Sequence, residues 1–143
     1  GWTIEWAANA IQGAEGADIV LVEGPGSINH PGHSGVTLGL LHGSCPDAMI
    51  LCHQASRKFI GDYRPQAWLA IPPLSEYVRL YETMASTVHP SRVIGIALNT
   101  YDLDDEAARR ACEEAARETG LPCTDPVRFE AAPLIAAIAG VRR

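Results

Sequence analysis

Four short apolar runs alternate with segments of helical periodicity along the chain. The runs occupy residues 18–23, 48–53, 92–99 and 121–125. A short run that is apolar on both faces of an extended chain predicts a strand covered on both sides. Because such strands alternate with helices, we expect an α/β fold, with a mostly parallel sheet of about four strands and helices on both faces.

The segments around these runs have apolar residues at helical spacing. We expect Ser75 and Asp104 to be N-caps, Gly120 to end a helix, and Pro133 to lie in a first turn, where proline is tolerated. A proline-containing loop is expected over residues 54–74. The predicted helices cover residues 2–12, 34–43, 75–86, 104–119 and 130–140.

The length, composition and charge of the chain indicate which class of protein it belongs to. Its 143 residues suit a single domain, and its composition, 47% hydrophobic and 20% charged, is that of a globular protein. The formal net charge of −6, without a basic cluster, argues against nucleic acid as a partner. No apolar run approaches the roughly 20 residues of a membrane helix, so we expect no membrane partner.

The four cysteines form no CxxC pair. Their spacing does not favour a zinc site, and we expect buried, reduced thiols, with Cys52 in the core. Reduced thiols and the lack of a signal-peptide pattern favour a cytoplasmic protein.

The first apolar run ends in an acid and a glycine-rich turn. Glu23 is followed by Gly24, Pro25, Gly26 and Ser27. In open α/β sheets ligands bind outside the carboxyl ends of the strands, where glycines let backbone amides approach a ligand. A carboxylate at this place can hold Mg²⁺ or orient a nucleophile, although a solvated turn would have the same pattern.

Two histidines follow the turn, ahead of a helix. His30 and His33 could each be a general base, hold a carboxylate or phosphate, or only bond the loop backbone. Ser34 and Thr37 begin the helix, where an anion is favoured. Pro31-Gly32 between the histidines excludes the usual helical geometry for a metal.

Polar residues also follow the other strands. His53 ends the second strand, Asn99 the third and Asp125 the fourth, and each is a candidate ligand-binding residue at the same edge of the sheet. The sequence has no G-x-x-x-x-G-K-[ST] phosphate loop, no G-x-G-x-x-G that opens a helix, and no G-x-S-x-G.

The segments "DIVLVEGPGSINHPGHSGVTLGLLHGSCPDAMILCH", "RVIGIALNT" and "GLPCTDPVRF" together resemble one bacterial family. The family was long of unknown function and now includes D-glutamate N-acetyltransferase. The resemblance implies a P-loop-like three-layer α/β domain related to dethiobiotin synthetase, with a Rossmann-like domain before it. Residues 1–143 would then be the carboxy-terminal portion of a two-domain protein, without the amino-terminal domain or the Walker A loop.

The resemblance implies acyl transfer from acetyl-CoA to the amino group of D-glutamate. Glu23 or His30 would be the base, backbone amides of residues 24–27 would stabilise the oxyanion, and Ser34 with Thr37 would hold a carboxylate or phosphate. Asn99 corresponds to a position that contacts the nucleotide base in related enzymes.

Two other hypotheses remain open. The first is an ATP-dependent ligase or kinase of the dethiobiotin-synthetase type, in which Glu23 serves Mg²⁺. The second is a non-catalytic fragment or subunit. In either case a sheet that lacks a strand leaves an edge uncovered, so we expect a homo-oligomer or a companion chain that carries the missing part.

Overall fold

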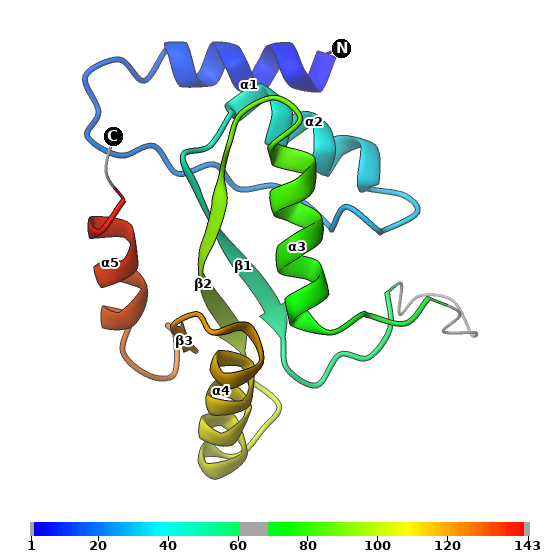
Figure 1. Ribbon diagram of the computed structural model, residues 1–143, viewed down its shortest axis with the longest axis vertical. Coiled ribbons are helices and arrows are strands. Elements are labelled where there is room, and N and C mark those ends of the chain that lie inside the picture. The colour runs from blue at the N-terminus through cyan, green and yellow to red at the C-terminus, as the bar shows by residue number, and fades with distance from the viewer. Residues whose placement is uncertain (1, 61–68, 142–143) are drawn as a thin grey trace.

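The computed structural model describes residues 2–60 and 69–141. These residues form five helices and three strands, arranged around one sheet (Figure 1). In chain order they are α1 (Trp2–Gln12), α2 (Ser34–Ser44), β1 (Ala48–Gln54), α3 (Leu74–Ala85), β2 (Arg92–Asn99), α4 (Asp105–Thr119), β3 (Cys123–Thr124) and α5 (Ala132–Ala139).

The sheet is parallel, with strand order β1-β2-β3. Met49 lies opposite Val93, whereas Ile50 lies opposite Gly95, so β2 contains one extra residue, Ile94. This bulge shifts the alternation of side chains along β2. It brings Val93 onto the same face as Ile96 and Leu98.

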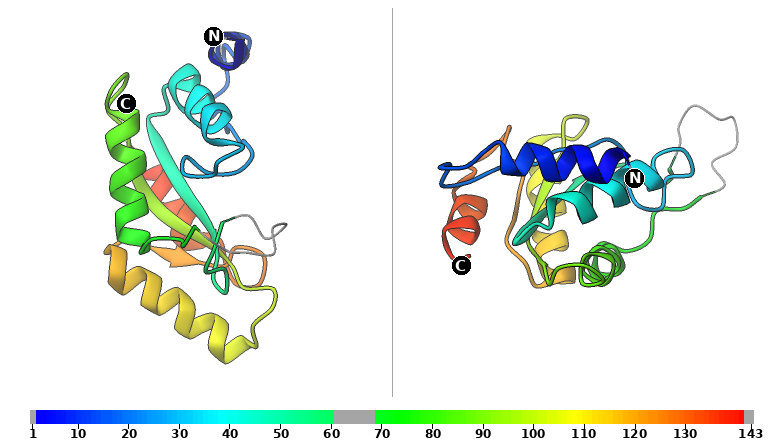
Figure 2. Two further views of the ribbon diagram at one scale, coloured as in Figure 1. Left: turned by 90° about the vertical axis from the view of Figure 1, so that its right-hand side faces the viewer. Right: turned by 90° about the horizontal axis from the view of Figure 1, so that it is seen from above.

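Helices cover both faces of the sheet, as the sequence predicts. On one face the core is built around Ile96, which is fully buried. Its partners from α3 and α4 include Leu74, Cys112 and Ala115. On the other face α5 packs closely against β2. A Cβ atom added at Gly95 would lie only 2.7 Å from Cδ2 of Leu134. Figure 2 shows α3 and α4 on the side of the sheet away from α1 and α2.

Helices α1 and α2 pack against each other with little space between their backbones. A Cβ at Gly43 would lie 2.5 Å from the carbonyl oxygen of Ile4, and one at Gly39 would lie 3.0 Å from Cβ of Thr3. These two glycines are four residues apart, so they share one face of α2. The close packing therefore depends on the absence of side chains along that face.

The prediction of a strand over residues 18–23 is wrong. This segment belongs to no strand, and the sheet has three strands where about four were expected. Its apolar residues are exposed, with Leu21 84% and Ile19 63% accessible. A strand requires a neighbour that completes its backbone hydrogen bonds. Among residues 2–60 and 69–141 no strand lies in register with this segment, so its β-forming composition does not produce a strand.

The local helix signals are mostly confirmed. The Asp104 side chain accepts a hydrogen bond from the amide of Ala107, and Gly120 ends α4 with φ +70°. Pro133 occupies the first turn of α5. Ser75 is not an N-cap, because α3 begins one residue earlier and Pro73 holds that position. The amide and hydroxyl of Ser75 donate instead to Glu118 of α4.

The expectation that the cysteines are buried is only partly met. All four are free, but Cys45 and Cys52 are exposed and only Cys112 is buried. Cys52 is therefore not a core residue. It lies near the end of β1, an edge strand of the sheet, and its side chain is accessible there. Burial raises the pKa of Cys123 to about 12.

Part of the expected loop over residues 54–74 lies outside the described residues. The parts on either side of residues 61–68 are joined by an antiparallel bridge between Phe59 and Ala70. The amide of Ile60 donates to the carbonyl of Leu69 at 2.9 Å. Within the described ranges, no helix combines the length and apolar character that crossing a membrane requires.

Candidate active site

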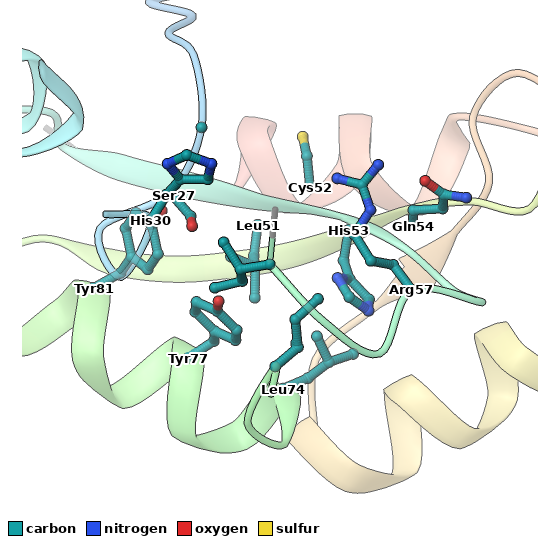
Figure 3. A pocket seen from close by; sticks show the side chains of 13 residues that line it. Ser27, His30, Leu51, Cys52, His53, Gln54, Arg57, Leu74, Tyr77 and Tyr81 are labelled. Atoms are coloured by element: carbon teal, nitrogen blue, oxygen red, sulfur yellow. The ribbon is translucent and has the colours of Figure 1, made fainter. Parts of the chain in front are cut away.

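A pocket of about 390 Å³ lies between the loop that precedes α2, the carboxyl half of β1, and α3 (Figure 3). This volume is within the range of small-molecule sites in proteins. Its polar lining consists of Ser27, His30, Cys52, His53, Gln54 and Arg57. Its apolar and aromatic lining consists of Leu51, Ile60, Ile71, Leu74, Tyr77 and Tyr81.

The pocket unites some of the predicted site residues and leaves out others. Gly26, Ser27, His30 and His53 line it, although they come from two separate parts of the chain. The remaining candidates lie outside the lining, namely Glu23, Gly24, His33, Ser34, Thr37, Asn99 and Asp125. The pocket thus lies at the carboxyl end of β1, the edge of a parallel sheet at which ligand binding is expected.

The turn before α2 depends on glycine. Gly26 has φ +71°, and a Cβ there would lie 2.5 Å from Cβ of His33. The Thr37 hydroxyl donates to the carbonyl oxygens of Pro25 and His33, at 2.9 and 3.1 Å. Thr37 therefore closes the turn onto α2. Ser34 begins α2, and His33 is its N-cap residue without a side-chain capping bond.

Two tyrosines of α3 anchor the same loop. The Tyr77 hydroxyl donates to Oδ1 of Asn29 at 2.5 Å, and the amide of Ile28 donates to the Tyr81 hydroxyl at 3.2 Å. Ser27 also donates to Oδ1 of Asn29, at 2.9 Å. Burial raises the pKa of the Tyr81 phenol, which stays protonated. The sequence gives no signal for these contacts, because both tyrosines also fit the apolar spacing of the helix over residues 75–86.

The hydrogen bonds of His30 define its tautomer. The amide of Gly32 donates to Nδ1 of His30 at 3.0 Å. In a neutral imidazole one nitrogen accepts and the other carries the proton. The proton of neutral His30 is therefore on Nε2. In this arrangement the ring acts as an N–H donor, which favours holding an anion or oxyanion over general-base catalysis.

His53 and Arg57 lie next to each other at the end of β1. Burial lowers the pKa of His53 below its ordinary value, and the positive charge of Arg57 lowers it further, whereas Glu118 opposes the shift. His53 is therefore neutral at neutral pH. Arg57 was not predicted from the sequence, because it lies in a loop without periodicity or a motif.

Glu23 is exposed, near the pocket and outside its lining. Partial desolvation by the surrounding protein raises the pKa of Cys52, which lines the pocket, and the negative charge of Glu23 raises it further. Among the described residues, no three His, Cys, Asp or Glu side chains group together as metal ligands. Since Mg²⁺ is usually held by one or two carboxylates plus phosphate oxygens, an ion at Glu23 would depend on a bound nucleotide.

Asp125 belongs to a separate cluster. It is 3% exposed. Its Oδ2 accepts hydrogen bonds from the amide and hydroxyl of Thr100, and its Oδ1 accepts from the amides of Val127 and Arg128. The four bonds favour a structural role for this carboxylate. Nearby, Asn99 accepts a hydrogen bond from the amide of Tyr101, which closes the turn after β2.

The parallel sheet with helices on both faces defines an α/β domain. The family model described as "Domain of unknown function (DUF1611_C) P-loop domain" matches residues 3–135. The chain belongs to this family.

Named relatives agree with this assignment. Two proteins called D-glutamate N-acetyltransferase are each 37% identical to the chain. The one from Pseudoalteromonas sp matches over 76% of this chain and 32% of its own length, and the one from Tritonibacter scottomollicae over 85% and 36%. The chain thus spans about a third of the length of these relatives, and the predicted resemblance is confirmed.

A solved structure has the same fold. The crystal structure of a DUF1611 family protein from Anabaena variabilis superposes with a TM-score of 0.86 at 42% sequence identity. The match covers 93% of this chain and 39% of the other. At this identity and coverage, the arrangement of β1, β2 and the helices is that of the family.

Proposed function

We propose that this chain contributes to an N-acyltransferase that moves an acetyl group from acetyl-CoA to the amino group of D-glutamate. The observation that carries the proposal is the pocket, in which residues of the glycine- and histidine-rich turn meet the end of β1. The names of the two relatives supply the substrate. The pocket is of a size for an amino acid rather than for the whole of CoA, whose nucleotide would lie outside it.

The chemistry requires a neutral amine and a stabilised oxyanion. We assign removal of the proton to Glu23, whose exposed carboxylate is close enough to Cys52 of the pocket lining to raise the pKa of that thiol. We assign stabilisation of the oxyanion to the Nε2–H of His30, since the bond from Gly32 to Nδ1 holds the ring in the donor tautomer. Within residues 24–27, the backbone N–H groups of Gly24, Gly26 and Ser27 remain candidates for the same role, since Pro25 has no N–H.

Substitution of these two residues tests the proposal. In the full-length protein, Glu23→Gln and His30→Ala are each expected to lower kcat for acetyl transfer by about 100-fold, as is typical for loss of a general base or an oxyanion donor. The measurement is the release of CoA that depends on D-glutamate.

Two variants outside the pocket serve as matched controls. Glu114 is exposed on α4, and His89 pairs with Asp47 at the surface. Glu114→Gln and His89→Ala should therefore retain nearly normal rates. If Glu23→Gln and His30→Ala also retained them, the assignment of both residues would be wrong.

An ATP-dependent ligase or kinase is the second candidate, and the P-loop description of the family favours it. Glu23 would then serve Mg²⁺ together with nucleotide phosphates. The same preparation distinguishes the two reactions. Phosphate release that requires ATP and a small acid supports the second candidate, and CoA release supports the first.

A further inference from the structure

Two phenol groups of α3 reach the loop that precedes α2, and they bond to it in opposite senses. The Tyr77 hydroxyl donates its hydrogen to Oδ1 of Asn29. The Tyr81 hydroxyl instead accepts a hydrogen bond from the amide of Ile28, at 3.2 Å. A phenol oxygen has one hydrogen to donate and can accept a bond at the same time. The hydrogen of Tyr77 is therefore used within the protein, whereas the bond from Ile28 leaves the hydrogen of Tyr81 available.

Tyr81 lines the pocket, so a ligand bound there can accept this hydrogen. Among residues 2–60 and 69–141, the Tyr81 hydroxyl donates no hydrogen bond. Burial raises the pKa of the phenol; the bond from Ile28 opposes the shift, and the neighbouring Tyr77 and Cys52 add to it. The phenol therefore keeps its proton at neutral pH and is a neutral O–H donor.

Tyr81 lies in the part of the pocket where the proposed function places the reacting groups. Figure 3 shows its ring at the end of the pocket that holds Ser27 and His30. Its hydroxyl contacts the backbone of the residue that follows Ser27. On the other side, the charge of Cys52 acts on Tyr81, and the charge of Glu23 acts on Cys52. The phenol is therefore close to both sides of the assigned reaction.

We propose that the Tyr81 hydroxyl donates a hydrogen bond to the thioester carbonyl oxygen as that oxygen becomes negative. The inference deepens the proposed function and rests on it for the reaction. The amine nitrogen bonds to the carbonyl carbon, and the C=O electron pair moves to oxygen. When that pair returns, the C–S bond breaks and CoA leaves as a thiolate, which takes up the proton that the nitrogen has lost to Glu23. A phenol that keeps its own proton stabilises the oxyanion without taking part in this proton transfer.

Tyr81→Phe and Tyr77→Phe, compared in the full-length protein, separate donation to the substrate from anchoring of the loop. Each variant removes one hydroxyl and one bond to the loop. Tyr81→Phe is expected to lower kcat for acetyl transfer by about 100-fold, the effect of losing an oxyanion donor, with the KM for D-glutamate changed less than about threefold. Tyr77→Phe should lower kcat by about tenfold at most, the effect of one net hydrogen bond. Tyr101→Phe should have no effect, since Tyr101 is 71% exposed and does not line the pocket.

Replacement of Tyr81 by a fluorinated tyrosine keeps the ring, the hydroxyl and the bond from Ile28. Fluorine makes a phenol more acidic, so the O–H donor is lost at a lower pH. The pH above which kcat falls is therefore expected to shift downward relative to the wild type. A phenolate still accepts the bond from Ile28, so a purely structural Tyr81 would produce no such shift. The other titratable groups that face Tyr81, namely Tyr77, Cys52 and His30, are the same in both proteins.

The inference is overturned if Tyr81→Phe keeps a normal kcat, if Tyr77→Phe lowers kcat as much as Tyr81→Phe does, or if fluorination leaves the alkaline limit of kcat unchanged. A wild-type protein that releases no CoA in response to D-glutamate would overturn the proposed function, and this inference with it. Normal transfer by the wild type together with a normal rate for Tyr81→Phe overturns the inference alone. The two failures are therefore distinguishable.

Discussion

Replacement of Asp125 by asparagine is expected to lower the free energy of unfolding by about 4 kcal/mol, the range of a broken buried network. The carboxylate accepts four hydrogen bonds, two at each oxygen, from Thr100, Val127 and Arg128. An asparagine side chain presents an NH₂ group at one of these positions, so donors would face donors. Urea denaturation followed by circular dichroism measures the change.

The same substitution at a neighbouring acid is the control. Asp105 pairs with Arg128 at 2.8 Å, but its side chain is 80% exposed. Exposed pairs contribute little, so Asp105→Asn should lower stability by less than about 1 kcal/mol. Equal unfolding midpoints for the two variants would contradict the structural role assigned to Asp125.

Lowering the pH is expected to narrow the difference in the free energy of unfolding between the wild type and Asp125→Asn. Burial raises the pKa of Asp125, but the hydrogen bonds from Thr100, Arg128 and Val127 outweigh it and leave the pKa below its ordinary value. A depressed folded-state pKa stabilises the protein above the unfolded-state pKa of about 3.9, and this stabilisation is lost as the pH falls through the folded-state pKa. Unfolding curves between neutral pH and pH about 2 measure the effect. If the difference in the free energy of unfolding between the two proteins stays constant over this pH range, the expected pH dependence is wrong.

Gly43→Ala is expected to lower the free energy of unfolding by about 3 kcal/mol, the upper range for overpacking, despite the better helix propensity of alanine. The new methyl group would meet backbone of α1, at 2.5 Å from the carbonyl oxygen of Ile4, and Cβ of Ala7 at 2.8 Å. Neither atom can move without displacing the helix. Urea denaturation gives the magnitude, and hydrogen exchange should show faster exchange in α1.

Gly35→Ala on the same helix is the matched control. A Cβ at Gly35 has no neighbour within 4 Å. Replacement there should stabilise the protein by about 0.5–1 kcal/mol through helix propensity alone. If both alanine variants are stabilised, the close approach of α1 and α2 does not hold.

Features that depend on neighbouring residues in sequence were predictable. The N-cap at Asp104 and the end of α4 at Gly120 follow from side-chain and backbone chemistry within one turn of helix. The apolar runs of β1 and β2 were likewise identified, because each is paired within the chain. Residues 18–23 have the same composition, yet pairing is a long-range property that composition does not report.

The candidate site was predictable only where its residues belong to a local sequence pattern. The position of His30 and His53 at the end of strands or in a glycine-rich turn is visible in the sequence. Arg57 and Asn29 are not, since an arginine in a loop and an asparagine in a turn have no pattern of their own. Their roles arise only when the loop, β1 and α3 come together.

The parallel pairing of β1 and β2 also has a kinetic consequence. Ala48 lies opposite Arg92, and all of α3 lies between them in the chain. Closing such a long segment costs chain entropy before any ladder hydrogen bond forms. We therefore expect pairing of β1 with β2 to be a slow step of folding, and changes in either strand should alter the refolding rate more than changes on the exposed face of α4, whose hydrogen bonds are local.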